Sequence, residues 1–305
     1  MLIGAVFLST KFLGANFEAM LPKILKKIVN RASKKLFPIY AMQQKVAGFK
    51  YHPNNIDLPN FCTEAGEPID SQDVLRQLRE NGAVAIPRFF EPATADAIRE
   101  ACLDYLHNHL SAENPPKVAI FDKKFGYENT ASIDGVTRLY HVEKRISQAQ
   151  SFALNPFMEA IGRAYYQQNV WLETTIFQHN QICAAGTRDW HIDSWLNQFK
   201  AFLYLSDVTD ENGPFTYLLG SHKNEGYLLR KTFRSMRGEE STSVPDAEAG
   251  RLGLEAKAFT ARKGTLLLAD TKGIHQGGTL VRGDRSALVN YYYVGNPRDI
   301  SDPQS

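Results

Sequence analysis

The sequence predicts a mainly β protein with flanking helices, in which an antiparallel barrel or jelly roll occupies the C-terminal half. Helical periodicity dominates the chain before Asn169, whereas short β-branched and aromatic runs, separated by Gly and Asn, dominate it afterwards. These runs cover residues 170–177, 199–205, 215–219, 265–268 and 287–294. The length of 305 residues and the hydrophobic content of 43% suffice for one large packed domain.

The N-terminal segment is basic and amphipathic. Between residues 21 and 36, apolar side chains recur at helical spacing among lysines and an arginine, with no acidic residue between them. Such a helix either packs on the domain with a solvated basic face or lies on an anionic membrane, where each basic side chain contributes about 1 kcal/mol. We therefore expect an extension over residues 1–60, with peripheral membrane contact through residues 20–36 as one interpretation. Met20 is an alternative start of the protein.

Further elements are expected before the β-rich half. They are a helix that Ser71 caps and Asn81-Gly82 ends, a strand over 83–86, a helix opened by Glu91-Pro92, and a helix over 156–166. The helices have ordinary amphipathic packing faces. Residues 61–305 are therefore expected to form one domain, with the β core over about 169–296.

Composition excludes several classes of protein. A net charge of +2 gives no general case for nucleic-acid binding. The three cysteines show no C-x-x-C or zinc spacing, which fits a reducing cytosol. Lys11 interrupts the apolar start, so a signal peptide is a weak interpretation, and no run of about 20 apolar residues can span a membrane. The expected location is cytoplasmic, peripheral on the inner membrane face if the basic helix binds lipid.

Two long stretches, 111–140 and 222–259, show no regular pattern. Loops of that length are usually functional or disordered. The second stretch carries four basic residues, Arg230, Lys231, Arg234 and Arg237. Their position suggests a lid that binds a phosphate or carboxylate on the substrate. A second basic group either lines the entrance or forms a solvated face: Arg138, His141, Lys144 and Arg145.

Three residues point to a metal site. His191 and Asp193 lie two residues apart, so in a strand their side chains share one face. This H-x-D motif is weak evidence alone, but the apolar strand 264–270 leads to a third candidate ligand, His275. Two histidines and one carboxylate on one face of an octahedral ferrous ion leave three positions open, which a bidentate 2-oxo acid and dioxygen can occupy.

An arginine follows at a useful position. Arg285 lies ten residues after His275, on the run into the last strand, where its planar fork can grip the distal carboxylate of 2-oxoglutarate. Arg282, on the intervening turn, is the competing candidate. Arg285 could instead pair with a surface carboxylate such as Asp284.

The order of these motifs resembles the phytanoyl-CoA dioxygenase family. The H-x-D motif, the Gly-Ser-His stretch at 220–222, His275 and Arg285 follow one another as in that family, and the similarity covers about 71–294. Segment 205–214 also resembles the family's strand and turn between the metal motifs. The resemblance implies a double-stranded β-helix, a cupin-like jelly roll. It also implies that His191, Asp193 and His275 are the catalytic iron ligands and that Arg285 anchors 2-oxoglutarate.

The resemblance further implies an activity. Such a dioxygenase uses Fe(II), 2-oxoglutarate and O2 to hydroxylate an unactivated C–H bond, with release of succinate and CO2. Asp193 is retained, which favours hydroxylation over halogenation. The family often has a lysine before H-x-D that this chain lacks, so Gln178 and Phe202 are the expected inner contacts to 2-oxoglutarate. His222, in the Gly-Ser-His stretch, is interpreted as a turn residue.

The substrate and two alternatives stay open. The family resemblance permits acyl thioesters, small metabolites, and sugar or lipid precursors, and the basic start favours a membrane-associated lipid or glycolipid. A largely apolar cavity is expected around the oxidant. One alternative is a cupin-like metalloenzyme with another co-substrate, and the other is a non-catalytic, membrane-tethered scaffold.

Overall fold

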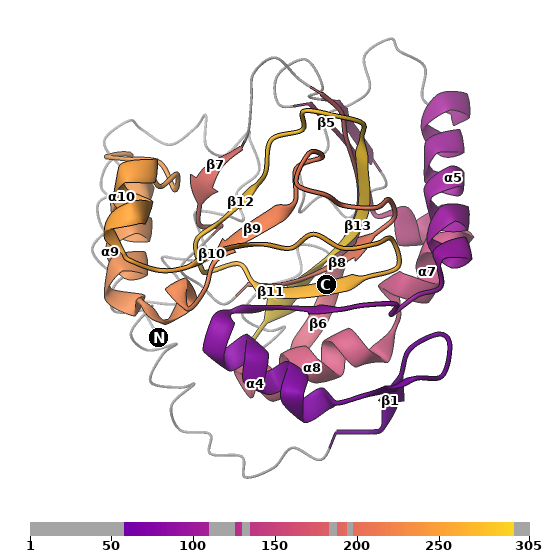
Figure 1. Cartoon of the computed structure of the whole chain (residues 1–305), viewed down its shortest axis with the longest axis horizontal. Helices are drawn as coiled ribbons and strands as arrows, with labels where there is room; N and C mark the ends of the chain where they lie inside the picture. Colours follow the sequence, from indigo (N-terminus) through magenta and orange to yellow (C-terminus); the bar gives the residue numbers. More distant parts are fainter. Residues whose placement is uncertain (1–57, 110–125, 130–134, 183–187, 194–197, 296–305) are drawn as a thin grey trace, which may run out of the picture.

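The computed structural model describes residues 58–109, 126–129, 135–182, 188–193 and 198–295 (Figure 1). The basic helix expected over residues 21–36, the alternative start at Met20 and the proposed membrane contact lie outside these residues. Within the described residues, no helix is both long and apolar enough to cross a membrane.

Two antiparallel sheets form the core of the molecule, as the sequence predicts. The larger sheet has the order β3 (Ala83–Ile86), β11 (Leu266–Asp270), β8 (Phe199–Tyr204), β13 (Arg285–Val294), β6 (Val170–Asn180), β5 (Val136–Tyr140) and β4 (Gly126–Asn129). The smaller sheet has the order β10 (Ala256–Ala258), β9 (Phe215–Leu218), β12 (His275–Gly277) and β7 (Arg188–His191). The rings of Phe202 and Phe215, one from each sheet, lie 5.0 Å apart at their centroids. The sheets therefore pack face to face, as in a double-stranded β-helix.

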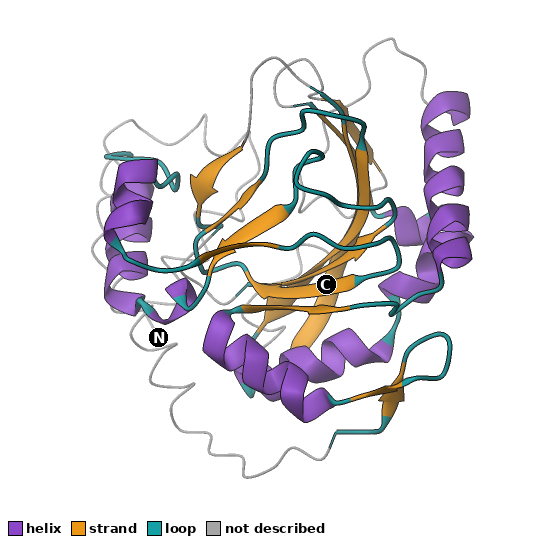
Figure 2. Ribbon diagram, viewed as in Figure 1, coloured by secondary structure: helices purple, strands orange, loops and turns teal. Residues whose placement is uncertain are grey.

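Helices cover the outer face of the larger sheet (Figure 2). They are α4 (Ser71–Asn81), α5 (Pro92–His109), α7 (Ser147–Ala153) and α8 (Pro156–Tyr166). A two-stranded ribbon, β1 (Phe61–Cys62) with β2 (Pro68–Ile69), precedes them. Buried side chains from these helices, including Leu78 and Phe157, pack with sheet residues such as Leu266 and Leu288. The alternation along each strand thus directs one set of side chains to the helices and the other set to the space between the sheets.

The ends of α4 test the predicted capping. Asp70, and not Ser71, is the N-cap, because its carboxylate accepts hydrogen bonds from the amides of Gln72 and Asp73 at 3.1 and 3.0 Å. The prediction was therefore wrong by one residue. At the other end, Gly82 adopts φ +86°, the left-handed conformation that a glycine C-cap favours, as predicted.

The stretch 222–259 is not an irregular loop, contrary to the prediction. After a short 3-10 turn, η2 (Ser221–Lys223), it forms α9 (Glu225–Met236) and α10 (Asp246–Arg251), and it ends in β10. The Asn224 side chain caps α9 by accepting from the amide of Tyr227 at 3.4 Å. The helices pack on a small second core that includes Leu228, Val244 and Ile192. This segment, residues 225–251, is called the insertion below.

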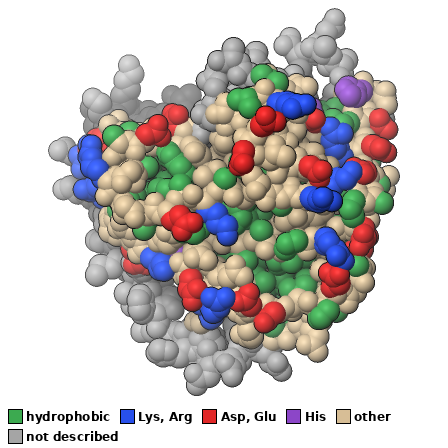
Figure 3. Space-filling view, viewed as in Figure 1, with side chains coloured by type: hydrophobic (Ala, Val, Ile, Leu, Met, Phe, Trp, Pro, Cys, Tyr) green, Lys and Arg blue, Asp and Glu red, His purple; other side chains and the backbone are tan. Residues whose placement is uncertain are grey.

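The described part of the stretch 111–140 forms β4 and β5, which extend the larger sheet beyond β6. A 3-10 turn, η1 (Val142–Lys144), then leads to α7. Together with β3, three strands from before Asn169 join the larger sheet. On the face shown in Figure 3, basic and acidic side chains are interspersed over the described surface.

Candidate metal centre

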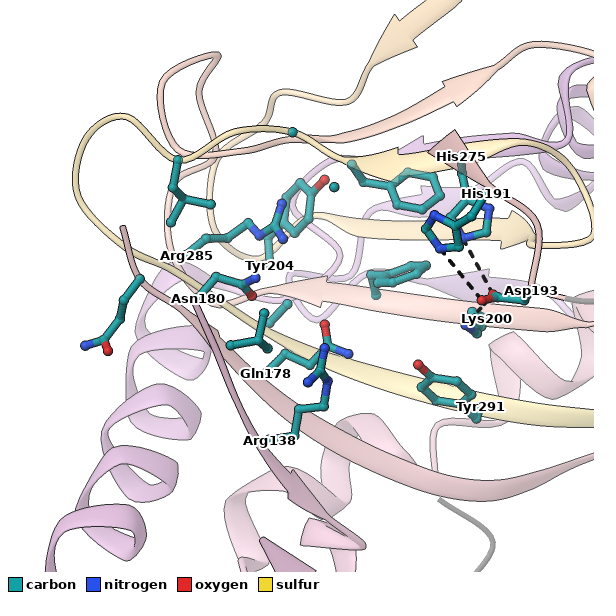
Figure 4. A pocket seen from close by; sticks show the side chains of 18 residues that line it. Arg138, Gln178, Asn180, His191, Asp193, Lys200, Tyr204, His275, Arg285 and Tyr291 are labelled. Carbon is teal, nitrogen blue, oxygen red and sulfur yellow. Dashed lines mark hydrogen bonds and ion pairs between the residues drawn. The ribbon is translucent and has the colours of Figure 1, made fainter. Parts of the chain in front are cut away.

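His191 and Asp193 lie at the end of β7. The strand ends at His191, so Asp193 lies just beyond it. The prediction that both residues lie within one strand is therefore correct for His191 only. The amide of Asp193 donates to the carbonyl of Thr271 at 3.2 Å, and the intervening Ile192 is fully buried and donates to the carbonyl of Thr242 at 3.1 Å. These bonds fix the backbone, and Figure 4 shows the His191 and Asp193 side chains directed toward each other.

His275 lies close to His191 and Asp193, although it comes from a later segment of the chain. The fully buried strand β11 leads through a tight turn to His275, the first residue of β12. His275 is the direct cross-strand partner of His191, and the two ring centroids lie 4.4 Å apart. Antiparallel pairing of β7 and β12 therefore brings together residues that are far apart along the chain.

The three side chains can share one ion. Their ligand atoms all lie within 4.8 Å of one another. The Nε2 atom of His275 lies 3.5 Å from Oδ2 of Asp193, and the Nε2 atom of His191 lies 3.9 Å from Oδ1 (Figure 4). Each Nδ1 faces a backbone carbonyl, that of Asp189 at 2.8 Å for His191 and that of Gly273 at 2.9 Å for His275. Because a carbonyl only accepts, both Nδ1 atoms carry the proton and both Nε2 lone pairs point inward.

The electrostatics keep His275 and Asp193 in their metal-binding protonation states. Burial lowers the pKa of His275 to about 3, so the ring is neutral near pH 7. Burial opposes ionisation of Asp193, but Lys200 and the two histidines outweigh it and hold its pKa well below the usual range. The site therefore offers two imidazole nitrogens and one carboxylate, a donor set that suits a ferrous ion.

Arg285 lies at another side of the same cavity (Figure 4). It begins β13 opposite Asn180 of β6, and burial lowers the pKa of its guanidinium. Beside it, burial raises the pKa of Tyr204 to about 12, and the Tyr204 hydroxyl donates to the carbonyl of Phe259 at 3.0 Å. Because an arginine side chain stays charged in proteins, Arg285 is a half-buried cation that lines the cavity together with the metal ligands.

The structure does not favour the two competing assignments, Arg282 as the co-substrate anchor and Asp284 as the partner of Arg285. The Arg282 side chain is 81% exposed and lies 3.8 Å from the carboxylate of Glu211. Asp284, the carboxylate that Arg285 could have paired with, instead binds Arg99 at 2.5 Å. Of the two candidate arginines, only Arg285 lines the cavity.

Both predicted inner contacts line the cavity as well. Gln178 of β6 lies opposite Ala287 of β13, and Phe202 of β8 lies opposite Val289. The complete lining is Val136, Arg138, Gln178, Asn180, Gln181, His191, Asp193, Lys200, Phe202, Tyr204, Phe215, His275, Gly277, Gly278, Leu280, Arg285, Ala287 and Tyr291. Many of these residues are charged or carry amides, so the expectation of a largely apolar cavity was wrong. Strands β5, β6 and β8 supply four of these polar groups, namely Arg138, Gln178, Asn180 and Lys200.

The remaining predicted residues lie in three environments. Arg138 lines the cavity, whereas His141 is buried beside Glu143, and Lys144 and Arg145 are exposed. His222 is a buried turn residue, and its Nε2 lies 3.2 Å from the carbonyl of Arg79.

The basic cluster of the insertion does not face the cavity. Lys231 is buried, and its Nζ lies 3.6 Å from Glu240 and 3.7 Å from Glu248. Arg234 and Arg237 both pair with Glu239. Acids that follow α9 in sequence therefore pair with three of the four basic residues, which argues against the predicted anion site. The fourth, Arg230, lies 5.7 Å from the ring centroid of Tyr227.

Sequence reasoning missed Lys200 and Tyr291. Both line the cavity, and Lys200 Nζ lies 2.5 Å from Oδ2 of Asp193 (Figure 4). A signal was present, because Lys200 lies two residues before Phe202 and therefore on the same face of β8. A lysine on the inward face of an otherwise apolar strand is a candidate for a functional group.

Comparison with known proteins identifies the family and the fold. The family model described as phytanoyl-CoA dioxygenase (PhyH) matches residues 78–285. No curated protein sequence matches the chain. Among solved structures, the chain is similar to EctD from S. alaskensis with 2-oxoglutarate and 5-hydroxyectoine (TM-score 0.55, 15% identity, 80% of this chain and 79% of that one). It is also similar to HygX from Streptomyces hygroscopicus with nickel and 2-oxoglutarate (0.51, 19%, 72% and 86%). A third similar structure is the non-heme alpha ketoglutarate dependent epimerase SnoN from nogalamycin biosynthesis (0.53, 15%, 73% and 82%).

Proposed function

We propose that this chain, which belongs to the phytanoyl-CoA dioxygenase family, is an Fe(II)- and 2-oxoglutarate-dependent hydroxylase. One observation carries the proposal. The inward Nε2 atoms of His191 and His275, the carboxylate of Asp193 and the half-buried guanidinium of Arg285 line one cavity. The first three groups suit a ferrous ion, and the fourth suits the distal carboxylate of a 2-oxo diacid.

The residues present fit both groups. His191, Asp193 and His275 would hold the iron, since two imidazole nitrogens and one carboxylate match its preferred donors. Arg285 would hold the 2-oxoglutarate carboxylate through two parallel hydrogen bonds. Iron with this co-substrate supplies dioxygen activation, in which 2-oxoglutarate is decarboxylated to succinate and CO2 and a substrate C–H bond is hydroxylated.

The protein's own groups contribute orientation and exclusion of water. Arg285 is already desolvated in the folded protein, so a carboxylate that binds it meets a fixed cation in a medium of low dielectric constant. The Tyr204 hydroxyl is engaged by the Phe259 carbonyl, which holds the phenol ring beside Arg285. The packed rings of Phe202 and Phe215 form an apolar wall of the same cavity.

The lining favours a polar small molecule as substrate. Gln178 and Asn180 present hydrogen-bonding side chains from β6. An acyl chain would offer these half-buried amides no hydrogen bond. A substrate that carries hydroxyl, amine or carboxylate groups satisfies them.

The test is an anaerobic titration of the metal-free protein with Fe(II) and 2-oxoglutarate. We expect the weak visible charge-transfer band of the iron chelate, and we expect Arg285→Ala to weaken 2-oxoglutarate binding by roughly 30-fold or more, since loss of one partner of a buried charge pair costs about 2–5 kcal/mol. Arg282→Ala is the matched control and should behave as the wild type. Bound iron without the band would point to another co-substrate or to a non-catalytic metal protein.

The hydroxylation and the polar substrate class need a second assay. Fractions of a cell extract are incubated with the iron-loaded protein, and succinate is measured with and without added 2-oxoglutarate. We expect polar fractions to stimulate succinate release and to contain a product heavier by one oxygen atom. Stimulation confined to lipid fractions would contradict the proposed substrate class.

A further inference from the structure

A buried lysine lies against one of the proposed metal ligands. Lys200 of β8 is only 7% exposed. Its Nζ is 2.5 Å from Oδ2 of Asp193 and 4.2 Å from the ring centroid of Tyr291. Tyr291 is the direct cross-strand partner of Lys200 on β13. The ammonium is thus bound by a carboxylate and by an aromatic face at once (Figure 4).

The backbone dictates this position. Lys200, Phe202 and Tyr204 alternate along β8, so all three side chains face the cavity between the sheets. A buried ammonium is costly unless an opposite charge compensates it. Among the described residues that line the cavity, Asp193 is the one acidic side chain. The pairing of Lys200 with Asp193 therefore follows from the inward position of Lys200 on β8 and from the charges that line the cavity.

The pairing makes the two oxygens of Asp193 different. Oδ2 lies 3.5 Å from Nε2 of His275 but already accepts a charge-assisted hydrogen bond from Lys200, whereas Oδ1 lies 3.9 Å from Nε2 of His191. Such bonds are roughly twice as strong as neutral ones. Carboxylates bind metal ions through one oxygen or through both, and an oxygen that already accepts from an ammonium is a poorer ligand.

We propose that Lys200 is a positioning residue that holds Asp193 as a one-oxygen metal ligand, an inference that rests on the proposed function. One-oxygen ligation by Asp193 and one nitrogen from each histidine leave three positions of an octahedral ion open, the number that a bidentate 2-oxo acid and dioxygen require. Ligation by both oxygens would take one of these positions. Lys200 thus protects the vacancy on which the proposed reaction depends.

The test is infrared spectroscopy of the zinc-loaded protein. The difference spectrum of zinc-loaded minus metal-free protein, with and without 13C-labelled aspartate carboxylates, isolates the stretches of Asp193. The separation between the asymmetric and symmetric stretches is wide for one-oxygen ligation and narrow for two-oxygen ligation. We expect a wide separation in the wild type and in Lys200→Arg, and a narrower one in Lys200→Met.

Further variants separate the charge from side-chain packing. Lys200→Gln keeps a hydrogen-bond donor without the charge, and it also serves if the methionine variant does not fold by circular dichroism. Lys263→Met is the matched control, because Lys263 pairs with Asp96 at 2.6 Å and does not line the cavity. We expect an intermediate separation in Lys200→Gln and the wild-type value in Lys263→Met.

Binding of 2-oxoglutarate gives a second readout. In Lys200→Met we expect zinc to stay bound and the apparent affinity for 2-oxoglutarate to fall by about 10-fold or more, within the range found for outer-shell partners of metal ligands. An unchanged infrared separation in Lys200→Met, or a narrow one in the wild type, overturns the proposal.

The two proposals fail in different ways. A wild-type protein with one-oxygen Asp193 that binds no 2-oxoglutarate would overturn the oxygenase assignment and support the role of Lys200. A wild-type protein that binds no divalent metal would overturn both.

Discussion

The segment that carries His275 and the segment that carries His191 and Asp193 meet at one site, but they are supported in different ways. The His275 segment leaves β11, which lies between β3 and β8 in the larger sheet. Its turn is fixed from outside, because the Tyr217 hydroxyl donates to the carbonyl of Asp270 and Ser221 Oγ accepts from the amide of Ile274, both at 2.8 Å. The main body of the protein therefore holds this half of the site.

The other segment depends on the insertion. β7 is an edge strand of the smaller sheet, with β12 on one side. On its free side, the amide of Ile192 donates to Thr242, and the amide of Val244 donates to the carbonyl of Trp190 at 2.6 Å. Both partners belong to the segment between α9 and α10. We therefore expect the His275 segment to be as rigid as the central core. The segment of His191 and Asp193 is expected to be only as rigid as the insertion.

The largest expected effect is on the His275 segment. A Cβ added at Gly273 would lie 1.8 Å from the Tyr217 hydroxyl and 2.9 Å from Ser221 Oγ, both of which are buried. We expect Gly273→Ala to lower the free energy of unfolding by about 3 kcal/mol and to abolish tight metal binding, because His275 must move. Denaturant unfolding and zinc titration measure both. In the insertion, a Cβ at Gly226 meets nothing within 4 Å, so Gly226→Ala should leave both quantities within about 1 kcal/mol of the wild type.

A smaller loss is expected when a single supporting hydrogen bond is removed. Tyr217→Phe deletes the donor to the Asp270 carbonyl at a fully buried position. The Asp270 carbonyl keeps the amide of Gly273 as a second donor, at 3.1 Å, so we expect unfolding to become easier by only about 0.5–1.5 kcal/mol, the net contribution of one hydrogen bond. Hydrogen exchange should become faster at Ile274 and stay unchanged at Ile192. Equal acceleration at both amides would show that the two segments open together, which would contradict their separate support.

A change that destabilises the insertion should instead affect the segment of His191 and Asp193 and spare the His275 segment. Lys231→Met leaves Glu240 and Glu248 without their buried cation, and both carboxylates are partly exposed, so the expected loss is about 1 kcal/mol. Exchange should become faster at Ile192 and Val244 and stay unchanged at Ile274. No change at β7 would mean that this strand does not depend on the insertion.

The smallest expected effect is the pH dependence of stability that His222 contributes, close to the His275 segment. Burial lowers the pKa of His222 in the folded protein, below about 6.5 for an unfolded histidine. The unfolded state therefore binds more protons below that pH, so stability is full above it and falls as pH decreases. For one such group the loss between pH 7 and 6 is at most about 0.7 kcal/mol. Metal-free His222→Gln should show a shallower fall than the wild type in urea unfolding, and an unchanged slope would contradict this.

The sequence was informative where chemistry depends on order along the chain. The positions of His191, Asp193, His275 and Arg285 could be predicted because the motifs follow one another at recognisable spacing. Their placement around one cavity agrees with that prediction. The local capping signal at Gly82 also sufficed to place the end of α4.

The failures share a physical cause, which is pairing between distant segments. The basic cluster was predicted to bind an anion because no acidic residue occurs from Gly226 to Gly238, yet Glu240 and Glu248 lie near Lys231 in the folded chain. The inward position of Lys200 on β8 was a usable signal, but its partners come from β13 and from Asp193 beyond β7. The sequence of a single element does not report either contact.

The pairing of β3 with β11 has a consequence for biosynthesis. β3 is made early, but its hydrogen-bonding partner leaves the ribosome only after the strands that carry most of the site. At about 5–20 residues per second, the two strands are completed roughly 10 to 40 s apart. Pairing at such long range also slows folding. Until β11 is made, the apolar strand β3 lacks its hydrogen-bonding partner, and the ligand set is incomplete until His275 follows.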